Sequence, residues 1–495
     1  MTFRIHLFLF LLLPLLAFAS PAGYRIVETP VMEPGRLEFL ADGGFDVWEV
    51  RDGVATLLVT PDEAARLEAN GFVLTLIDEP DPHAKAVDGF YTFAEYEAIM
   101  QEWAAQYPAI VQLSSIGNSH EGRDLWLLKI SDNVATDEPD EPEFLFIGLQ
   151  HAREWLAGTT LHGITNHLIT QYGTEPRVDA VVNGFQIYVL LVSNPDGYVY
   201  THTTERLWRK NRRNNGNGTF GVDLNRNWPY KWDTASGSTG SNLYRGPSPL
   251  SEPENAALND WILSRNGRVA GCLNYHAYGN LVMHSWAWTT ATAPGAELMT
   301  PLVTNMATAM HAVHNQTYSA GSWGVALGYT GGGVTDDTFH ATYGIPMITS
   351  EVRPRTIGEG GFEPPGTFIQ PAFEEQLEGC FVYLEWTLAH ATDPTPPVIT
   401  NFRHTRINDS TVDLFWNTDD PATREVLLTP AGSTPVTIGA DKLRATSHSL
   451  RLTGLVPGRL YTARAVSTNL AHGTTTSAPL SFRTTLQEGQ VWIVE

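Results

Sequence analysis

Residues 144–155 read FLFIGLQHAREW, and this stretch decides the fold. The apolar run from Phe144 to Gly148 predicts a buried strand, and a helix is predicted directly after it, from Leu156 to Tyr172. His151 and Glu154 therefore stand where a buried strand ends, which is where open α/β sheets bind their ligands. An imidazole and a carboxylate three residues apart can bind one metal ion. Alone the pair is a weak signal, because a surface turn before a helix can carry the same residues.

Strands and helices alternate on both sides of this stretch. Further strands are predicted at Gln186–Val192, Val269–Asn274 and Ile345–Thr349, and further helices at Phe93–Gln106, Glu252–Ser264 and Phe373–His390. Alternation of this kind is typical of an α/β domain with a buried sheet. We expect residues 88–391 to form a mixed, largely parallel sheet with helices on both faces.

A small α+β unit is predicted over residues 20–85, ahead of the α/β region. Phe45–Val50, Ala55–Val59 and Phe72–Ile77 are strand candidates around a helix at Pro61–Asn70. The acidic, proline-containing segment Asp78–Pro82 follows and is a plausible boundary between the two units.

The composition changes after the proline-rich segment 393–397, where Thr, Ser, Val and Arg dominate without a helical period. Val412–Trp416 and Thr462–Val466 are strand candidates. Leu455, Pro457 and Tyr461 resemble the tyrosine corner of fibronectin type III domains. Residues 397–486 are therefore predicted to form a β-sandwich.

The first 19 residues predict a secretory signal peptide. Arg4 supplies a positive start, Leu7–Leu16 an apolar run and Ala17-Phe18-Ala19 a cleavage site. The run is short for a bilayer, and no later stretch is long and apolar enough to span one, so we expect no membrane span. The mature protein is expected to be secreted into the extracellular space, or into the periplasm of a Gram-negative bacterium.

Composition excludes several classes of protein. The chain has 495 residues, enough for two or three domains, and 42% of them are hydrophobic, which excludes a disordered or fibrous protein. Acidic residues outnumber basic ones by 54 to 31, for a net charge of −23. Nucleic-acid binding needs the opposite balance. The two cysteines, Cys272 and Cys380, are expected to be buried free thiols rather than a disulfide, and the protein to be a monomer.

Several motifs along residues 88–391 together resemble the zinc carboxypeptidases of the A/B type. The matching pieces are His151–Trp155, Asn194–Tyr198, Arg206–Lys210, Gly221–Trp228, Asn274–Tyr278, Tyr329 and Thr349–Arg353. They occur in the family's order, and His151, His276 and Glu351 all fall at or just after predicted strand ends. The resemblance implies a zinc exopeptidase that acts on peptides and proteins with a free C-terminus.

The resemblance also implies catalytic roles for particular residues. His151, Glu154 and His276 correspond to the three ligands of one Zn²⁺, with water in the fourth position. Glu351 corresponds to the general base that takes the proton of this water and passes it to the leaving amine. Arg209 corresponds to the group that polarises the scissile carbonyl.

The substrate-binding residues follow from the same resemblance. Asn225 and Arg226 correspond to the pair that binds the substrate's terminal carboxylate, which a guanidinium fork matches in shape. Tyr329 corresponds to the tyrosine of a mobile loop, with Gly331–Gly333 beside it as hinges. Arg153 corresponds to a secondary substrate-binding residue, and Tyr278, in the His276 motif, is placed with the substrate-binding group.

Asp336 falls seven residues after Tyr329, where B-type members of the family carry an aspartate at the pocket floor. A carboxylate there favours C-terminal Lys or Arg over an aromatic residue. Gly324, Gly328 and Gly331 would leave room for a long side chain. A slip of one residue, to the adjacent Asp337, would make Asp336 an ordinary aspartate, and broad specificity is the rival expectation.

Three further expectations concern the whole protein. The N-terminal unit resembles the family's propeptide and would cover the active site until cut in the acidic linker, or serve as a folding aid. A peptidase of peptidoglycan stem peptides is the alternative enzyme. An inactive adhesion module that displays the β-sandwich to a cell surface or polymer is the alternative from another class, and the retained ligands, base, Arg209 and Arg226 argue against it.

Overall fold

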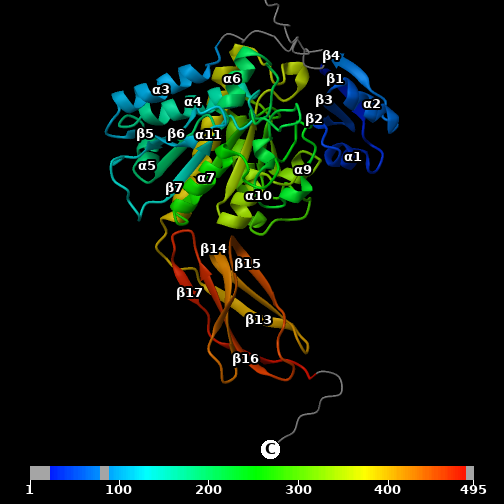
Figure 1. The fold of residues 1–495 in the computed structure, drawn as a ribbon. Helices are drawn as coiled ribbons and strands as arrows, with labels where there is room; N and C mark the ends of the chain where they lie inside the picture. Colours follow the sequence, from blue (N-terminus) through cyan, green and yellow to red (C-terminus); the bar gives the residue numbers. More distant parts are fainter. Residues whose placement is uncertain (1–22, 79–88, 487–495) are drawn as a thin grey trace, which may run out of the picture.

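A computed structural model describes residues 23–78 and 89–486. The predicted signal peptide lies outside these residues, and so does the predicted boundary segment Asp78–Pro82 except for Asp78 itself. Three units follow one another along the chain, and Figure 1 shows the central one flanked by a small N-terminal unit and a C-terminal β unit.

The central unit is built on a mixed sheet of eight strands within the described residues, in the order β11-β10-β12-β9-β7-β8-β6-β5. The strands are β5 (Val111–Asn118), β6 (Asp124–Ile130), β7 (Glu143–Ile147), β8 (Gln186–Leu190), β9 (Val269–Ala277), β10 (Leu281–His284), β11 (Ser319–Ser322) and β12 (Met347–Val352). The four central strands, β12, β9, β7 and β8, are parallel to one another. Antiparallel pairs join β12 to β10, β8 to β6 and β6 to β5. The predicted mixed α/β sheet is thereby confirmed.

Helices cover both faces of this sheet (Figure 1). The helices are α3 (Phe93–Gln106), α4 (Trp155–Thr170), α5 (Pro176–Val182), α6 (Pro195–Thr203), α7 (Pro253–Ser264), α8 (Ala296–His314), α9 (Trp323–Ala326), α10 (Thr335–Thr338) and α11 (Ile369–Ala391). On one face α3, α4, α8 and α11 pack on a large apolar core. On the other, α7 packs against Leu145 and Ile147 of β7. All four predicted helices are present, α3 with the predicted bounds.

The N-terminal unit is an antiparallel sheet, in the order β2-β3-β1-β4, with two helices. Its elements are β1 (Arg25–Pro30), α1 (Arg36–Asp42), β2 (Asp46–Arg51), β3 (Val54–Val59), α2 (Pro61–Ala69) and β4 (Thr75–Asp78). It has an apolar core of its own, and the partly buried Tyr329 of the central unit packs against that core. The unit therefore folds around its own centre while resting on the central unit.

The C-terminal unit is an antiparallel β unit around the buried Trp416. Its strands are β13 (Ile399–Ile407), β14 (Val412–Pro430), β15 (Val436–Leu452), β16 (Leu460–Thr468), β17 (Thr474–Thr476) and β18 (Leu480–Arg483). The hydroxyl of Tyr461 accepts a hydrogen bond from the backbone N–H of Val456 at 2.8 Å. This bond closes a corner of the kind predicted from Leu455, Pro457 and Tyr461.

The C-terminal unit meets the central unit backbone to backbone. A Cβ atom at Gly344 would lie 2.2 Å from the carbonyl oxygen of Lys442, and one at Gly295 would lie 2.4 Å from that of Arg444. Arg444 also donates to the carbonyl of Gly344 at 2.6 Å. Glycine is therefore needed at both positions for the two units to approach this closely.

Two smaller expectations can be checked on the described residues. Cys272 and Cys380 are both buried free thiols, as predicted. No helix in residues 23–78 or 89–486 is long and apolar enough to cross a membrane.

Candidate active site

The candidate site lies where β7, β9 and β12 end, at one edge of the central sheet. His151 and Glu154 occupy the turn between β7 and α4, and His276 is near the end of β9. Glu351 on β12 is the register partner of His276 on the adjacent parallel strand. Parallel strands bring their carboxyl ends to one edge, so residues from three distant parts of the sequence converge.

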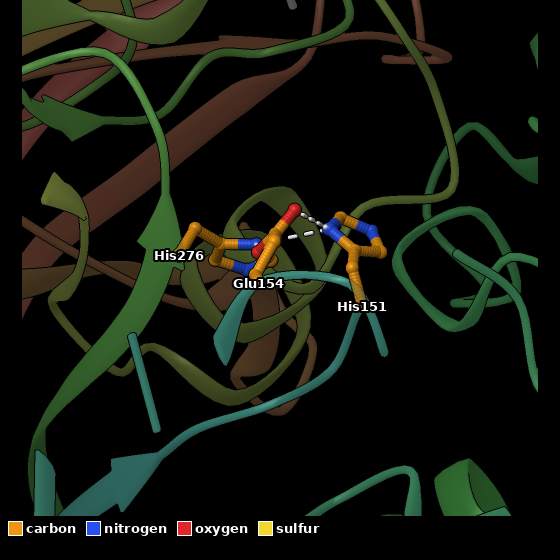
Figure 2. Close-up of side chains that lie close together, drawn as sticks. All are labelled: His151, Glu154 and His276. Carbon is orange, nitrogen blue, oxygen red and sulfur yellow. Dashed lines mark hydrogen bonds and ion pairs between the residues drawn. The ribbon is translucent and has the colours of Figure 1, made fainter. Parts of the chain in front are cut away.

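Figure 2 shows the side chains of His151, Glu154 and His276 turned toward one another. Nδ1 of His151 lies 2.7 Å from one carboxylate oxygen of Glu154, and Nδ1 of His276 lies 2.9 Å from the other. The two Nδ1 atoms are 3.1 Å apart. Two imidazoles and one carboxylate that converge on one point are the ligand set of a catalytic zinc site. All three side chains are buried.

The other ring nitrogen of each histidine is also held. Nε2 of His151 lies 3.1 Å from a carboxylate oxygen of Asp223, and Nε2 of His276 lies 2.9 Å from the side-chain amide of Asn274. The Asp223 carboxylate is an acceptor of the kind that orients a ligand imidazole and raises its basicity, whereas the Asn274 amide nitrogen is a donor and holds only the position of the His276 ring. The residues present therefore fit a zinc ion at this point.

The charge of Glu154 is set by its two histidine neighbours. Burial alone would raise the pKa of its carboxyl, but the adjacent imidazoles of His151 and His276 outweigh burial and lower the pKa below its usual range. A carboxylate that stays ionised while buried is suited to bind a cation.

Glu351 has the opposite electrostatic setting. Its carboxyl pKa is raised well above the usual value, first by burial and then by the neighbouring charge of Glu154. Its Oε2 atom has no hydrogen-bond partner among the described residues. A carboxyl group of this kind is suited to accept a proton, as a general base must.

Arg209 is held beside the triad by Asp223. Its Nε and Nη2 atoms donate to the same carboxylate oxygen of Asp223 at 3.1 and 2.9 Å, and its Nη1 atom lies 3.8 Å from Glu154. Burial would lower the pKa of the guanidinium, but Asp223 and other carboxylates raise it, so Arg209 stays charged. A fixed cation at this place can stabilise negative charge on a substrate.

Asn225 and Arg226 follow Asp223 in a turn of 3-10 helix, Leu224–Arg226. The carbonyl oxygen of the Asn225 side chain accepts from the backbone N–H and the hydroxyl of Thr335, both at 2.9 Å. The Nδ2 atom of Asn225 makes no hydrogen bond within the residues that the structure describes. Arg226 and Arg209 both line a cavity of about 200 Å³, which Tyr329 also borders. The structure thus brings Arg209, Arg226 and Tyr329 to one cavity, and Asn225 precedes Arg226 in the same turn.

Two of the glycines beside Tyr329, Gly332 and Gly333, pack closely against the backbone of a neighbouring segment. A Cβ atom at Gly332 would lie 2.1 Å from the carbonyl oxygen of Lys231, and one at Gly333 would lie 2.2 Å from that of Arg226. Glycine is therefore required at these positions by the close approach of the Tyr329 loop to the segment that carries Arg226.

Arg153 and Tyr278 lie under the N-terminal unit. Arg153 forms a two-pronged ion pair with Asp46 of β2, with N–O distances of 2.7 and 2.9 Å, and both side chains are buried. Tyr278 packs edge-on against Trp48 of the same strand. Asp42, Phe45 and Asp46 also line the cavity that Arg209 and Arg226 share. The N-terminal unit therefore covers this part of the candidate site.

Asp336 is fully buried and both of its carboxylate oxygens accept from the hydroxyl of Thr349, at 2.8 and 3.0 Å. Burial raises the pKa of its carboxyl to about 6. Among the described residues it forms no ion pair. Asp336 is not part of the lining of the cavity that Arg209 and Arg226 share. Of the three glycines expected around the specificity pocket, Gly331 lines this cavity, and Gly324 and Gly328 do not.

Two residues of the site were not among the predicted ones. Asp223 joins His151 to Arg209, and it stands inside the Gly221–Trp228 motif, so its position next to Asn225 was the available signal. Asp46 pairs with Arg153 across 107 positions of sequence, and an alternating strand gives no sign of such a partner.

A model of the zinc carboxypeptidase family matches residues 96–379 of the chain. Carboxypeptidase B of Astacus astacus is 34% identical over 294 residues, which are 59% of this chain and 94% of that protein. Carboxypeptidase O of Bos taurus is 33% identical over 300 residues, 60% of this chain and 78% of that protein. The crystal structure of carboxypeptidase A from Helicoverpa armigera matches with a TM-score of 0.66 and 26% identity, over 76% of this chain and all of that chain.

Proposed function

The chain belongs to the zinc carboxypeptidase family, and on that premise we propose that it removes single residues from the C-terminus of peptides and proteins with His151, Glu154 and His276 as its zinc ligands. The observation that carries this assignment is the convergence of the two Nδ1 atoms and both oxygens of Glu154 within hydrogen-bond distance. The family is one of zinc-dependent hydrolases, and the proposal assigns the zinc ligands and the catalytic and substrate-binding residues of this chain.

The metal end of the site supplies the nucleophile. When bound, zinc acts as a Lewis acid and lowers the pKa of a water to about 7. Asp223 and Asn274 hold the outer nitrogens of the two histidines, so the inner nitrogens stay aimed at one point. Glu351 takes the proton of the attacking water and delivers it to the leaving amine.

The other end of the site selects a free carboxylate. Arg209 stabilises the oxygen that becomes negative as the water attacks. Arg226 pairs with the terminal carboxylate of the substrate, and Asn225 donates to it from Nδ2, the atom that has no partner within the described chain. A substrate without this carboxylate leaves buried donors unpaired, which is why the activity is that of an exopeptidase.

Replacing one ligand tests the assignment. The variant His276→Ala should lose one equivalent of zinc and its activity. The matched control is His284→Ala, because His284 is also buried, on β10 of the same sheet, and among the described residues it hydrogen-bonds only to Ser285 and Thr300. Zinc content by atomic absorption should fall in the first variant and stay at one equivalent in the second. Equal zinc in both would overturn the ligand set.

We also propose that the N-terminal unit is a propeptide that keeps the enzyme inactive until it is cut away. The support is the buried pair between Asp46 and Arg153, together with Asp42 and Phe45 in the wall of the cavity next to Arg226. Because these residues of the unit share one cavity wall with Arg209 and Arg226, the unit occupies space that a bound peptide would need. Cleavage in the acidic segment that follows Asp78 would leave the unit free to dissociate.

The test is the rate of peptide hydrolysis by the full chain before and after limited proteolysis. Asp46→Asn should raise the activity of the uncut chain, because Arg153 loses its ionised partner. Glu49→Gln is the control, since Glu49 is on the same strand and accepts a hydrogen bond from the backbone N–H of Ile357, which glutamine can also accept. An uncut chain as active as the cut one would exclude the propeptide role.

We further propose a preference for C-terminal Lys or Arg, with Asp336 as the residue that recognises them. Asp336 is a buried carboxyl without a cationic partner among the described residues, and its raised pKa shows the cost of that state. A lysine or arginine side chain of the substrate would supply the missing charge. Hydrolysis of matched substrates that end in Arg, Lys, Phe or Leu decides this, and a preference for Phe or Leu would overturn it.

We infer that the protein is secreted as a monomer and that its C-terminal unit is a fibronectin type III-like domain that contacts a cell surface or a polymer. The signal-like residues 1–19 support export, and the Tyr461 corner supports the domain type. Detection of the processed chain in the culture medium, starting after Ala19, tests export.

A further inference from the structure

We propose that Gln150 is a positioning residue for the carboxylate-binding pair, acting through Thr335 on Asn225. This rests on the proposed function of Asn225 and Arg226. Gln150 is the last residue before His151 and is 2% exposed. Its side chain joins two other segments of the site, through Asn274 and Thr335.

A chain of buried polar groups runs from β9 to Asn225 through Gln150. Nδ2 of Asn274 donates to Oε1 of Gln150 at 3.2 Å, and Nε2 of Gln150 donates to the hydroxyl of Thr335 at 2.8 Å. The hydroxyl of Thr335 donates in turn to Oδ1 of Asn225 at 2.9 Å. All four side chains are buried, so water does not compete for these bonds. Asn274, Gln150, Thr335 and Asn225 therefore form one connected bridge.

The bridge fixes which face of the Asn225 amide points toward a substrate. The backbone N–H of Thr335 can only donate, and it lies 2.9 Å from the Asn225 side chain, so that side must be the carbonyl oxygen. The amide nitrogen then faces the other way, where no described group accepts from it. A substrate carboxylate needs a donor there. Gln150 supports this state because its side-chain amide holds the Thr335 hydroxyl against Asn225: the hydroxyl lies 2.8 Å from Nε2 and 3.2 Å from Oε1 of Gln150, and 2.9 Å from Oδ1 of Asn225.

The other end of the bridge is Asn274, which contacts the proposed ligand His276. Among the described residues, the side chain of Gln150 makes no hydrogen bond to a proposed zinc ligand. Asn274 contacts Nε2 of His276 and also donates to Gln150. Loss of the Gln150 side-chain amide leaves the contact between Asn274 and His276 in place. A change at Gln150 should therefore alter substrate binding and leave zinc affinity nearly unchanged.

Gln150→Met and Thr335→Val test the bridge, because each keeps volume and removes the polar group. On the full chain cut by limited proteolysis, each should raise KM by about five- to tenfold, the size of one buried hydrogen bond, with kcat within about twofold. The double variant should be no worse than either single one, since both break the same link. Thr335→Ser keeps the hydroxyl and should retain the KM of the natural chain.

Controls separate this inference from the proposed function and from a general loss of packing. Gln186→Met removes a buried amide that bonds to Glu138, far along the sheet, and should leave KM unchanged. If Arg226→Ala leaves KM unchanged, the proposed carboxylate site fails; if it raises KM and Gln150→Met does not, only the role of Gln150 fails. Zinc affinity, measured on the uncut chain by competition with a chelator, should change less than about threefold in Gln150→Met. A larger loss of zinc, or additive effects in the double variant, would overturn the positioning role.

Discussion

The two ends of the candidate site are built in opposite ways. At the metal end, His151, Glu154 and His276 already contact one another, and both histidines are held from behind. At the carboxylate end, Asn225 has a donor without a partner among the described residues, and Arg226 lines a cavity of about 200 Å³. The side chains of the metal end hold one another in place, whereas the carboxylate end has a donor that a substrate would have to pair. Damage to the metal end should therefore reduce turnover, and damage to the carboxylate end should weaken substrate binding.

The largest expected effect is on turnover at the metal end. Glu351→Gln removes the proposed proton acceptor but leaves His151, Glu154 and His276 in place. We expect kcat to fall by about 10²–10⁴-fold, the usual contribution of a general base, with one zinc still bound. Steady-state kinetics on the cut chain and metal analysis on the same sample check this. A near-normal kcat would show that Glu351 is not the general base, and a loss of zinc would show that Glu351 helps to bind the metal.

The next effect sharpens the contrast at the carboxylate end. Arg226→Ala should lower kcat/KM by about 2–5 kcal/mol, the cost of leaving a buried charge of the substrate unpaired. Most of the loss should appear in KM, and Arg226→Lys should recover part of it because lysine keeps the charge without the planar fork. Kinetics with one blocked dipeptide measures both variants. A loss confined to kcat would show that the two ends do not divide the work in this way.

A smaller effect concerns the pH dependence of specificity at Asp336. Only the ionised carboxylate pairs with a basic side chain, and burial raises the pKa of Asp336 to about 6. The ratio of kcat/KM for Arg over Leu substrates should therefore increase as the pH rises from 5 to 7. In Asp336→Asn this ratio should be low and should not change with pH. A constant ratio in the natural chain would show that Asp336 does not contact the substrate.

The smallest effect is on stability. The pKa of Asp336 is raised from 3.8 to about 6 in the folded protein, so the folded state holds its proton more tightly than the unfolded state. This carboxyl therefore lowers the free energy of unfolding as pH rises from about 4 to about 6. Asp336→Asn removes this loss and should be more stable than the natural chain at pH 7, by about 1–3 kcal/mol, but not at pH 3.5.

Thermal unfolding at both pH values compares the two proteins. The neighbouring Asp337 has its pKa raised to about 7, first by burial and also by the charge of Asp336, so the difference between the two proteins reports Asp336 together with its effect on Asp337. Equal stability at pH 7 would show that the buried carboxylate has a compensating partner.

Local sequence signals were enough for the elements that lie within one stretch of chain. Helix α3 begins after Thr92, whose hydroxyl and backbone N–H exchange hydrogen bonds with Glu95 in a capping box, and its predicted bounds are confirmed. The triad was reachable because its members stand in the motifs His151–Trp155 and Asn274–Tyr278, which resemble those of the family and follow or end apolar strands. In contrast, helix α8 was not predicted, and it contains Pro301, a residue that normally ends a helix.

Sequence reasoning missed the contacts that depend on how distant segments pack. The pair between Asp46 and Arg153 joins two units, and no periodicity in either segment indicates it. The bridge through Gln150 depends on Thr335, 185 positions away. Of the three glycines predicted as hinges, Gly332 and Gly333 lie close against the backbone of Lys231 and Arg226, a contact that no local pattern indicates. Motifs quoted from the sequence named the residues at both ends of the site, whereas the contacts that hold those residues in place arise only in the folded chain.

The most direct test measures hydrolysis of a blocked dipeptide and of its C-terminal amide by the cut chain, each with and without a chelator. A zinc carboxypeptidase that works as proposed should cleave the free acid and leave the amide nearly untouched. The chelator should abolish cleavage, and one equivalent of zinc should restore it. Cleavage of the amide at the rate of the free acid, or full activity in the presence of the chelator, would contradict the proposed mechanism.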